Sequence, residues 1–94
     1  MGEYTPNVLG GDKMKKQITI KSTAGLHASL AAKLVQAASK YDIDLRLIYD
    51  DRVVDAKSIL GLMSLAIPSG ENVILIAEGD DATKAMEEIE KIIG

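Results

Sequence analysis

The spacing of apolar residues along this chain changes repeatedly between the two-residue period of a strand and the 3.6-residue period of a helix. Because 94 residues make one domain and no more, these segments must share one hydrophobic core. Alternating or continuous apolar stretches predict strands at residues 17–21, 44–47, 53–55 and 73–77. Helical spacing predicts helices at residues 28–40, 59–64 and 82–93. The order β-α-β-β-α-β-α predicts an α+β domain with three helices on one face of a four-stranded sheet and solvent on the other.

Local signals mark the ends of these segments. Asp50–Asp51 is a tight-turn signal, so residues 44–55 are expected to form a hairpin. Ser58 precedes the short second helix and is a natural N-cap, and Asp80 or Asp81 can cap the last one. The continuous apolar run Val73–Ala77 predicts a strand at the centre of the sheet.

Composition excludes several classes of function. Without cysteine the chain has no disulfide, thiolate metal site or cysteine nucleophile, and we expect a cytoplasmic protein. It has one histidine and no carboxylate cluster with ligand spacing, so we expect neither a metal nor a cofactor. The net charge of −3, with no basic stripe, argues against nucleic acid as a partner. No apolar run approaches the ~20 residues that a membrane helix needs, so membrane insertion is not expected.

The first residues differ from the rest of the chain. Residues 1–13 contain Pro6 and the pair Gly10–Gly11 and show no sustained periodicity. We interpret them as a flexible leader, native or left over from cloning, in front of a domain at residues 14–94. The alternative is an additional ordered strand around Asn7–Leu9.

The most informative local feature is the single histidine, His27, where a helix is expected to begin. The first N–H groups of a helix lack internal partners and its dipole is positive there, which makes this end suitable for an anion. If His27 accepted a phosphoryl group, the N–H groups of Ala28, Ser29 and Leu30 could hold its oxygens, and the dipole should favour the neutral, nucleophilic imidazole. Alternatively, His27 only starts the helix or packs as a partly buried polar group, and spacing alone favours this second interpretation.

Two segments resemble the HPr family, the histidine phosphocarriers of the sugar phosphotransferase system. Gly25–Ala31 is similar to the family's site motif Gly-Leu-His-Ala-Arg-Pro-Ala. Lys57–Leu65 is similar to its regulatory-serine motif, Lys-Ser-Ile-Met-Gly-x-Met-Ser-Leu, and the separation of His27 from Ser58 is that of the family. The resemblance covers residues 15–94 without a gap. It implies an open-faced β-sandwich whose antiparallel sheet has the strand order 1-4-2-3.

The resemblance also implies a function. An enzyme I-like donor would phosphorylate His27, which would pass the group to sugar permease components, so the chain would be a phosphotransfer carrier rather than a stand-alone enzyme. The apolar residues Leu60 and Met63 of the short helix, together with Leu26, would dock these partners. Core filling is the alternative role for such residues, and we expect it of Leu62 and Leu65.

One departure from the family motif concerns the site itself. Ser29 and Leu30 stand where the family has arginine and proline. The arginine is taken to assist the phosphorylated imidazole, and a hydrogen bond to a charged group contributes roughly 1.5–3 kcal/mol, or about 10- to 150-fold. We therefore expect weakened transfer. Ser29 could still donate its hydroxyl or cap the helix, and Leu30 could face a partner.

Ser58 is the second candidate site. The resemblance implies phosphorylation by a dedicated serine kinase, and the added charge would disfavour an acidic partner. This leaves an alternative function, a regulatory binding module that acts through phosphorylated Ser58 with a transcriptional repressor in catabolite control. Ser58 can also be an ordinary N-cap, and the chain an HPr-fold protein with neither activity.

Overall fold

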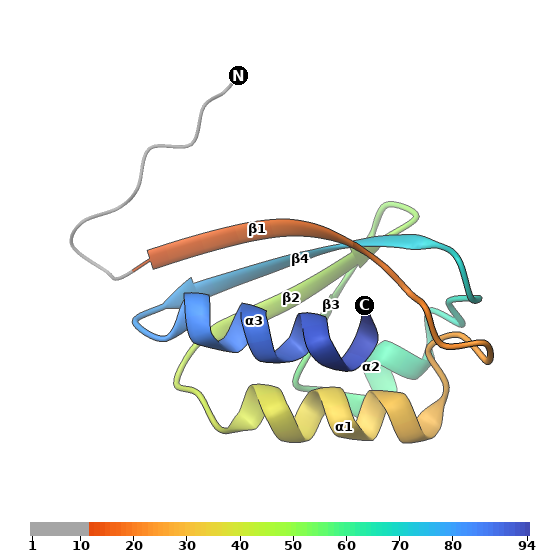
Figure 1. Ribbon diagram of the computed structural model, residues 1–94, viewed down its shortest axis with the longest axis horizontal. Coiled ribbons are helices and arrows are strands. Elements are labelled where there is room, and N and C mark those ends of the chain that lie inside the picture. The colour runs from red at the N-terminus through yellow and green to blue at the C-terminus, as the bar shows by residue number, and fades with distance from the viewer. Residues whose placement is uncertain (1–11) are drawn as a thin grey trace.

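The computed structural model describes residues 12–94, and its elements follow the predicted order. The strands are β1 (Asp12–Thr19), β2 (Asp44–Tyr49), β3 (Arg52–Asp55) and β4 (Asn72–Gly79). The helices are α1 (Ala28–Ser39), α2 (Ile59–Met63) and α3 (Ala82–Ile93). All three helices lie on one face of the sheet (Figure 1), which confirms the predicted α+β, two-layer architecture.

The four strands form one antiparallel sheet in the order β1-β4-β2-β3. β4 lies between β1 and β2, as its continuous apolar run predicts. Its side chains alternate between the two faces: Val73, Leu75 and Ala77 are buried under the helices, whereas Ile74 and Ile76 are half-buried on the other face. A strand with apolar residues on both faces is therefore placed at the centre of the sheet, where it has a hydrogen-bonded neighbour on each side.

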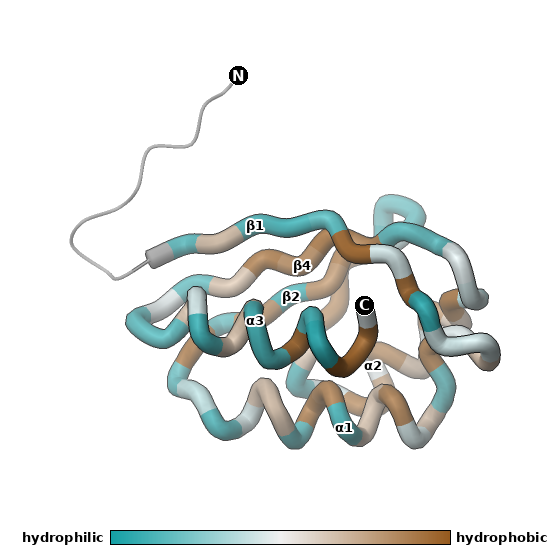
Figure 2. The backbone as a smooth tube through the Cα atoms, in the orientation of Figure 1, coloured by the Kyte–Doolittle hydropathy of each residue, from teal (hydrophilic) through white to brown (hydrophobic). Residues whose placement is uncertain are grey.

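The core is aliphatic and contains no buried polar or charged side chain among the described residues. The apolar faces of α1 and α3 pack against the inner face of the sheet through residues such as Leu34 and Ile89, both fully buried. Figure 2 shows the corresponding alternation of hydrophobic and hydrophilic residues along both helices. Burying one such side chain contributes about 1.5–3 kcal/mol, so the many Leu, Ile and Val residues stabilise the domain without any Phe or Trp.

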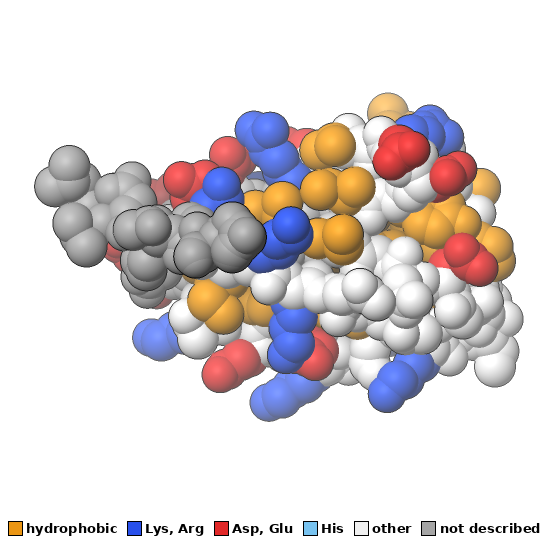
Figure 3. Space-filling view, turned by 90° about the horizontal axis from the view of Figure 1, so that it is seen from above, with side chains coloured by type: hydrophobic (Ala, Val, Ile, Leu, Met, Phe, Trp, Pro, Cys, Tyr) orange, Lys and Arg blue, Asp and Glu red, His pale blue; other side chains and the backbone are white. Residues whose placement is uncertain are grey.

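The outer face of the sheet is open, and it is the face seen in Figure 3. Apolar side chains gather near its middle, between lysines, arginines and carboxylates. The residues are Ile48, Ile74 and Ile76, which are half-buried, and Val53, which is exposed. The prediction of one wet face thus holds, although the central rows of that face are more apolar than alternation alone indicates.

β1 begins earlier than the sequence predicts. Asp12 pairs with Gly79 and Lys13 with Glu78, so β1 starts five residues before the predicted strand start at Gln17, and these two residues of the predicted leader belong to the sheet. The physical reason is that β4 is long enough to pair with them. Residues 1–11, including the alternative strand at Asn7–Leu9, lie outside the described residues.

The predicted hairpin at residues 44–55 is formed by β2 and β3. The two residues between the strands, Asp50 and Asp51, have φ angles of 52° and 65°. A two-residue turn with both φ values positive matches the twist of the paired strands, and aspartate tolerates that conformation better than most residues. The acidic pair is therefore explained by turn geometry.

A polar cluster links α1, α3 and the residue before Ser58. The Tyr41 hydroxyl donates to Glu88 Oε1 at 2.6 Å, and the Lys40 ammonium pairs with the other carboxylate oxygen. Lys57 Nζ donates to the Tyr41 carbonyl at 3.1 Å. The bonds from Lys40 and Tyr41 hold the pKa of Glu88 below its ordinary value of 4.5, and the bond to Glu88 raises the pKa of Tyr41.

This cluster predicts a pH-dependent contribution to stability. A lowered carboxylate pKa stabilises the fold above the unfolded pKa near 4.5, and that stabilisation is lost as the pH falls through the folded pKa. We expect Glu88→Gln to lower the Tm at pH 7, and the difference from wild type to shrink below pH 4. Thermal unfolding at pH 7 and at pH 3 measures both values. Glu87→Gln, an equal charge change on an exposed neighbour, is the control. A difference that persists unchanged at pH 3 would contradict the account.

Candidate functional site

The turn before α1 is held against the segment that connects α2 to β4. Leu26 N–H donates to the Ile67 carbonyl at 2.9 Å. Gly25 has a φ of +72°, and a Cβ at this position would lie 2.3 Å from Ile67 O. Only glycine satisfies both the positive φ and this close approach. Gly25 thereby fixes the path of the chain into His27, whose N–H donates to the Gly25 carbonyl at 3.0 Å.

His27 is the N-cap of α1, as its place in the sequence predicts. Its backbone is extended, with φ −89° and ψ 178°, and its side chain makes no capping hydrogen bond. The first helical bond runs from Ala31 N–H to the His27 carbonyl at 2.8 Å. The N–H groups of Ala28, Ser29 and Leu30 precede this bond and have no intrahelical acceptor. The half-buried imidazole therefore stands at a helix end with three available donors.

Two expectations about the departures from the family motif are wrong. Leu30 is 8% exposed and packs in the core, because it lies on the inner face of α1 with Leu34. Its side chain therefore faces neither solvent nor a partner. Ser29 is exposed and lies inside the helix, two residues after the N-cap His27, so it does not cap α1.

Ser58 is the N-cap of α2, which confirms the sequence prediction. Its backbone is extended, and its Oγ accepts a hydrogen bond from Gly61 N–H at 3.1 Å. The side chain is half-buried, so its hydroxyl lies at the surface end of this short helix rather than in the core.

The exposed face of α2 is apolar. Leu60 is 83% exposed, Ile59 43% and Met63 41%. Leu60 and Met63 were predicted as docking residues and are exposed, and Ile59, which the sequence analysis did not name, is exposed beside them. Helical spacing could have identified it, because Ile59 and Met63 are four residues apart and share one face.

The other apolar residues near the site are buried. Leu26 is 4% exposed, so its predicted part in docking is wrong: the bond that its N–H makes to Ile67 turns the side chain into the core. Leu62 and Leu65 lie in the core, as predicted.

The structure brings the start of α1, where His27 is the N-cap, and α2 to the same end of the molecule (Figure 1). Two backbone bonds tie the segments that carry them, one from Leu26 to Ile67 and one from Gly70 N–H to the Ile20 carbonyl at 2.8 Å. The imidazole, the free amides of α1 and the exposed residues of α2 thus belong to segments at one end of the molecule.

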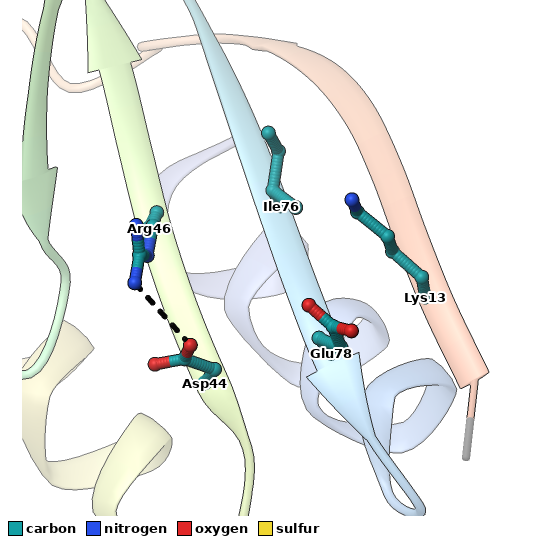
Figure 4. Close-up of a pocket in the computed structure, with 5 residues that line it drawn as sticks. All are labelled: Lys13, Asp44, Arg46, Ile76 and Glu78. Atoms are coloured by element: carbon teal, nitrogen blue, oxygen red, sulfur yellow. Dashed lines mark hydrogen bonds and ion pairs between the residues drawn. The ribbon is translucent and has the colours of Figure 1, made fainter. Parts of the chain in front are cut away.

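A pocket of about 250 Å³ lies elsewhere, on the open face of the sheet (Figure 4). Its lining residues come from three neighbouring strands and are Lys13, Asp44, Arg46, Ile76 and Glu78. Arg46 pairs with Asp44 at 3.5 Å. None of the predicted site residues lines it. Within residues 12–94 no group of His, Asp or Glu side chains could hold a metal ion, and no helix could span a membrane.

The fold and the histidine at the start of α1 define an open-faced β-sandwich of the HPr type. A family model described as "PTS HPr component phosphorylation site" matches residues 14–94. The chain therefore belongs to the HPr family.

Named relatives include members of two kinds. The chain is 46% identical over 74 residues to "HPr-like protein Crh" of Halalkalibacterium halodurans, covering 79% of this chain and 88% of the relative. It is 40% identical over 77 residues to "Phosphocarrier protein HPr" of Treponema pallidum, covering 82% and 88%. The crystal structure of HPr from Bacillus anthracis superposes with a TM-score of 0.83 at 35% identity, over 87% of this chain and 98% of that one.

The close approach at Gly25 predicts an unusually costly alanine substitution. Gly25→Ala and Gly70→Ala both place alanine at a positive φ, +72° and +88°, which costs roughly 1–2 kcal/mol. A Cβ at Gly70 meets nothing within 4 Å, whereas at Gly25 it clashes with backbone. We expect Gly25→Ala to lose about 1–3 kcal/mol more than Gly70→Ala in urea unfolding. Equal losses would show that the close approach does not constrain this turn.

Proposed function

We propose that the chain is a phosphocarrier, in which His27 accepts a phosphoryl group from an enzyme I-like donor and passes it to sugar permease components. The observation that carries this proposal is the place of His27, a half-buried imidazole at the N-terminus of α1 before three amides without intrahelical acceptors. Membership in the HPr family supports it. We place this exchange in the cytoplasm.

In the proposed phosphoryl transfer, the protein positions the His27 imidazole and the backbone N–H groups that hold the phosphoryl oxygens. A ring nitrogen of neutral His27 uses its lone pair to form an N–P bond, while the bond between phosphorus and the donor's leaving atom breaks and that atom keeps the electron pair. The N–H groups of Ala28, Ser29 and Leu30, with the positive helix end, would hold the phosphoryl oxygens. In the second transfer an atom of the acceptor forms a bond to phosphorus. The N–P bond then breaks, and the His27 nitrogen keeps the electron pair.

Partners would dock on the exposed face of α2. Leu60 and Met63 are exposed apolar side chains of α2, the helix that lies at the same end of the molecule as the start of α1 (Figure 1). Burial of such side chains at a contact is favourable, and methionine adapts its shape to different surfaces. A carrier that must recognise both a donor and an acceptor benefits from such a surface.

A second candidate function is a regulatory binding module that acts through Ser58. A serine kinase would add a phosphate to the Ser58 hydroxyl, and the modified surface would bind a transcriptional repressor. The specific observation in its favour is that Ser58 Oγ is half-buried at the start of α2, beside the docking residues, where about −1.5 to −2 added charges would alter recognition. A solved structure that is 39% identical, that of "Crh, the Bacillus subtilis Catabolite Repression HPr", is consistent with it. The retained His27 favours the carrier.

The carrier proposal predicts one acid-labile phosphate on His27. Incubation with purified enzyme I and phosphoenolpyruvate should raise the intact mass by one phosphoryl group, which mild acid removes. His27→Ala should gain none, while its circular dichroism and Tm stay close to wild type because the side chain is a surface group that makes no capping bond. Labelling that survives in His27→Ala would exclude His27 as the acceptor, and unfolding of this variant would show a structural role instead.

The regulatory alternative predicts dependence on Ser58. With ATP and an HPr serine kinase, wild type should gain an acid-stable phosphate and Ser58→Ala none. Calorimetry should then detect repressor binding only for the phosphorylated wild type. Ser64→Ala, at the other end of α2, is the control. Equal repressor binding by wild type and Ser58→Ala would remove this second function.

A further inference from the structure

Two stretches of the chain, one that contains His27 and one that contains α2, carry no charged side chain. Residues 22–32 and residues 58–70 contain no Asp, Glu, Lys or Arg. These stretches are the turn and first part of α1, and α2 with the segment that leads towards β4. Neither stretch therefore supplies a cation for a phosphoryl group on His27.

Three lysines flank these stretches, and their surroundings differ. The Lys57 ammonium group already has a hydrogen-bond partner, because its Nζ donates to the Tyr41 carbonyl at 3.1 Å. The backbone N–H of Lys21 bonds to the Ile93 carbonyl at 3.2 Å, which places this residue beside the end of α3. Lys33 is exposed on α1, and within residues 12–94 its side chain has no hydrogen bond or ion pair. Lys33 is thus the available cation on the helix that His27 begins.

The helix geometry directs Lys33 towards the site. Lys33 lies four residues after Ser29, so the two residues are neighbours on one face, with Cβ atoms about 5–6 Å apart. Side chains of a helix point back towards its N-terminus. The start of α1 at Ala28 is five residues away, roughly 7.5 Å along the axis at 1.5 Å per residue. The flexible four-carbon stem of lysine can cover about this distance over the small Ser29 side chain.

We propose that the Lys33 ammonium group stabilises the phosphoryl group at the carrier site. It would supply, from one turn further along α1, the positive charge that is missing because Ser29 stands where the family has arginine. This inference rests on the proposed phosphocarrier function and names the residue that would stabilise the phosphoryl group during transfer. Lys33 makes no bond to phosphorus, and the covalent step at the imidazole is unchanged. Because Lys33 is exposed, water solvates its ammonium group when no phosphoryl group is bound, and the fold needs no carboxylate beside it.

A double-substitution experiment tests this role. The rate of His27 phosphorylation is measured for wild type, Lys33→Gln, Ser29→Arg and the double variant, with purified enzyme I and, separately, with phosphoramidate, a small donor that has no docking surface. We expect Lys33→Gln to lower the rate about fivefold to tenfold with both donors, and Lys33→Arg to retain most of it. In the Ser29→Arg background the same change should cost less than about twofold, because one cation replaces the other. Lys21→Gln is the control for the loss of one positive charge.

The outcomes separate the two proposals. If wild type is labelled and Lys33→Gln is equally fast, or if the losses are the same with and without Ser29→Arg, the role of Lys33 is overturned and the carrier function stands. An effect with enzyme I but not with phosphoramidate would show that Lys33 serves docking, which also overturns the inference. If neither donor labels His27, the carrier function fails and the role of Lys33 fails with it.

Discussion

The site depends on the backbone contact between the turn before α1 and the segment after α2. Gly25 approaches Ile67 too closely for any side chain, and Leu26 donates to the same carbonyl. This contact joins two segments about 40 residues apart in the sequence, so it determines that His27 and α2 share one surface. The placement brings the free amides at the start of α1 and the exposed apolar residues of α2 to the same end of the molecule.

The proposed functional residues lie outside the hydrophobic core, so the core does not have to bury a polar or charged side chain to hold them. The core is filled by aliphatic side chains from both layers, and no polar or charged residue among those described is buried. The proposed functional groups lie at the surface: His27 and Ser58 at the N-termini of α1 and α2, and Leu60 on the exposed face of α2. At a helix N-terminus the unpaired N–H groups and the helix dipole favour a negative charge. Under the proposed function, changes at His27 or Leu60 should accordingly alter phosphoryl transfer and partner recognition more than folding.

Local patterns predicted most of the fold. The apolar run of β4 gave its central position, the Asp50–Asp51 pair gave the hairpin, and Ser58 gave the start of α2, because each signal depends only on neighbouring residues. The start of β1 at Asp12 was missed because it depends on pairing with Gly79, 67 residues away in the sequence. Strand pairing over such a separation leaves no local pattern.

Side-chain placement at the site was less predictable for the same reason. Leu26 and Leu30 flank the histidine in the sequence, yet tertiary packing turns both into the core, whereas Ile59 of the five-residue α2 stays outside. The claim on which this account depends is that His27 itself carries the phosphoryl group. Phosphorus NMR of the ¹⁵N-labelled protein, recorded after incubation with phosphoenolpyruvate and catalytic enzyme I, tests it directly. The account predicts one phosphorus resonance coupled to a ring nitrogen of His27; a phosphate-ester signal alone, or none, would contradict it.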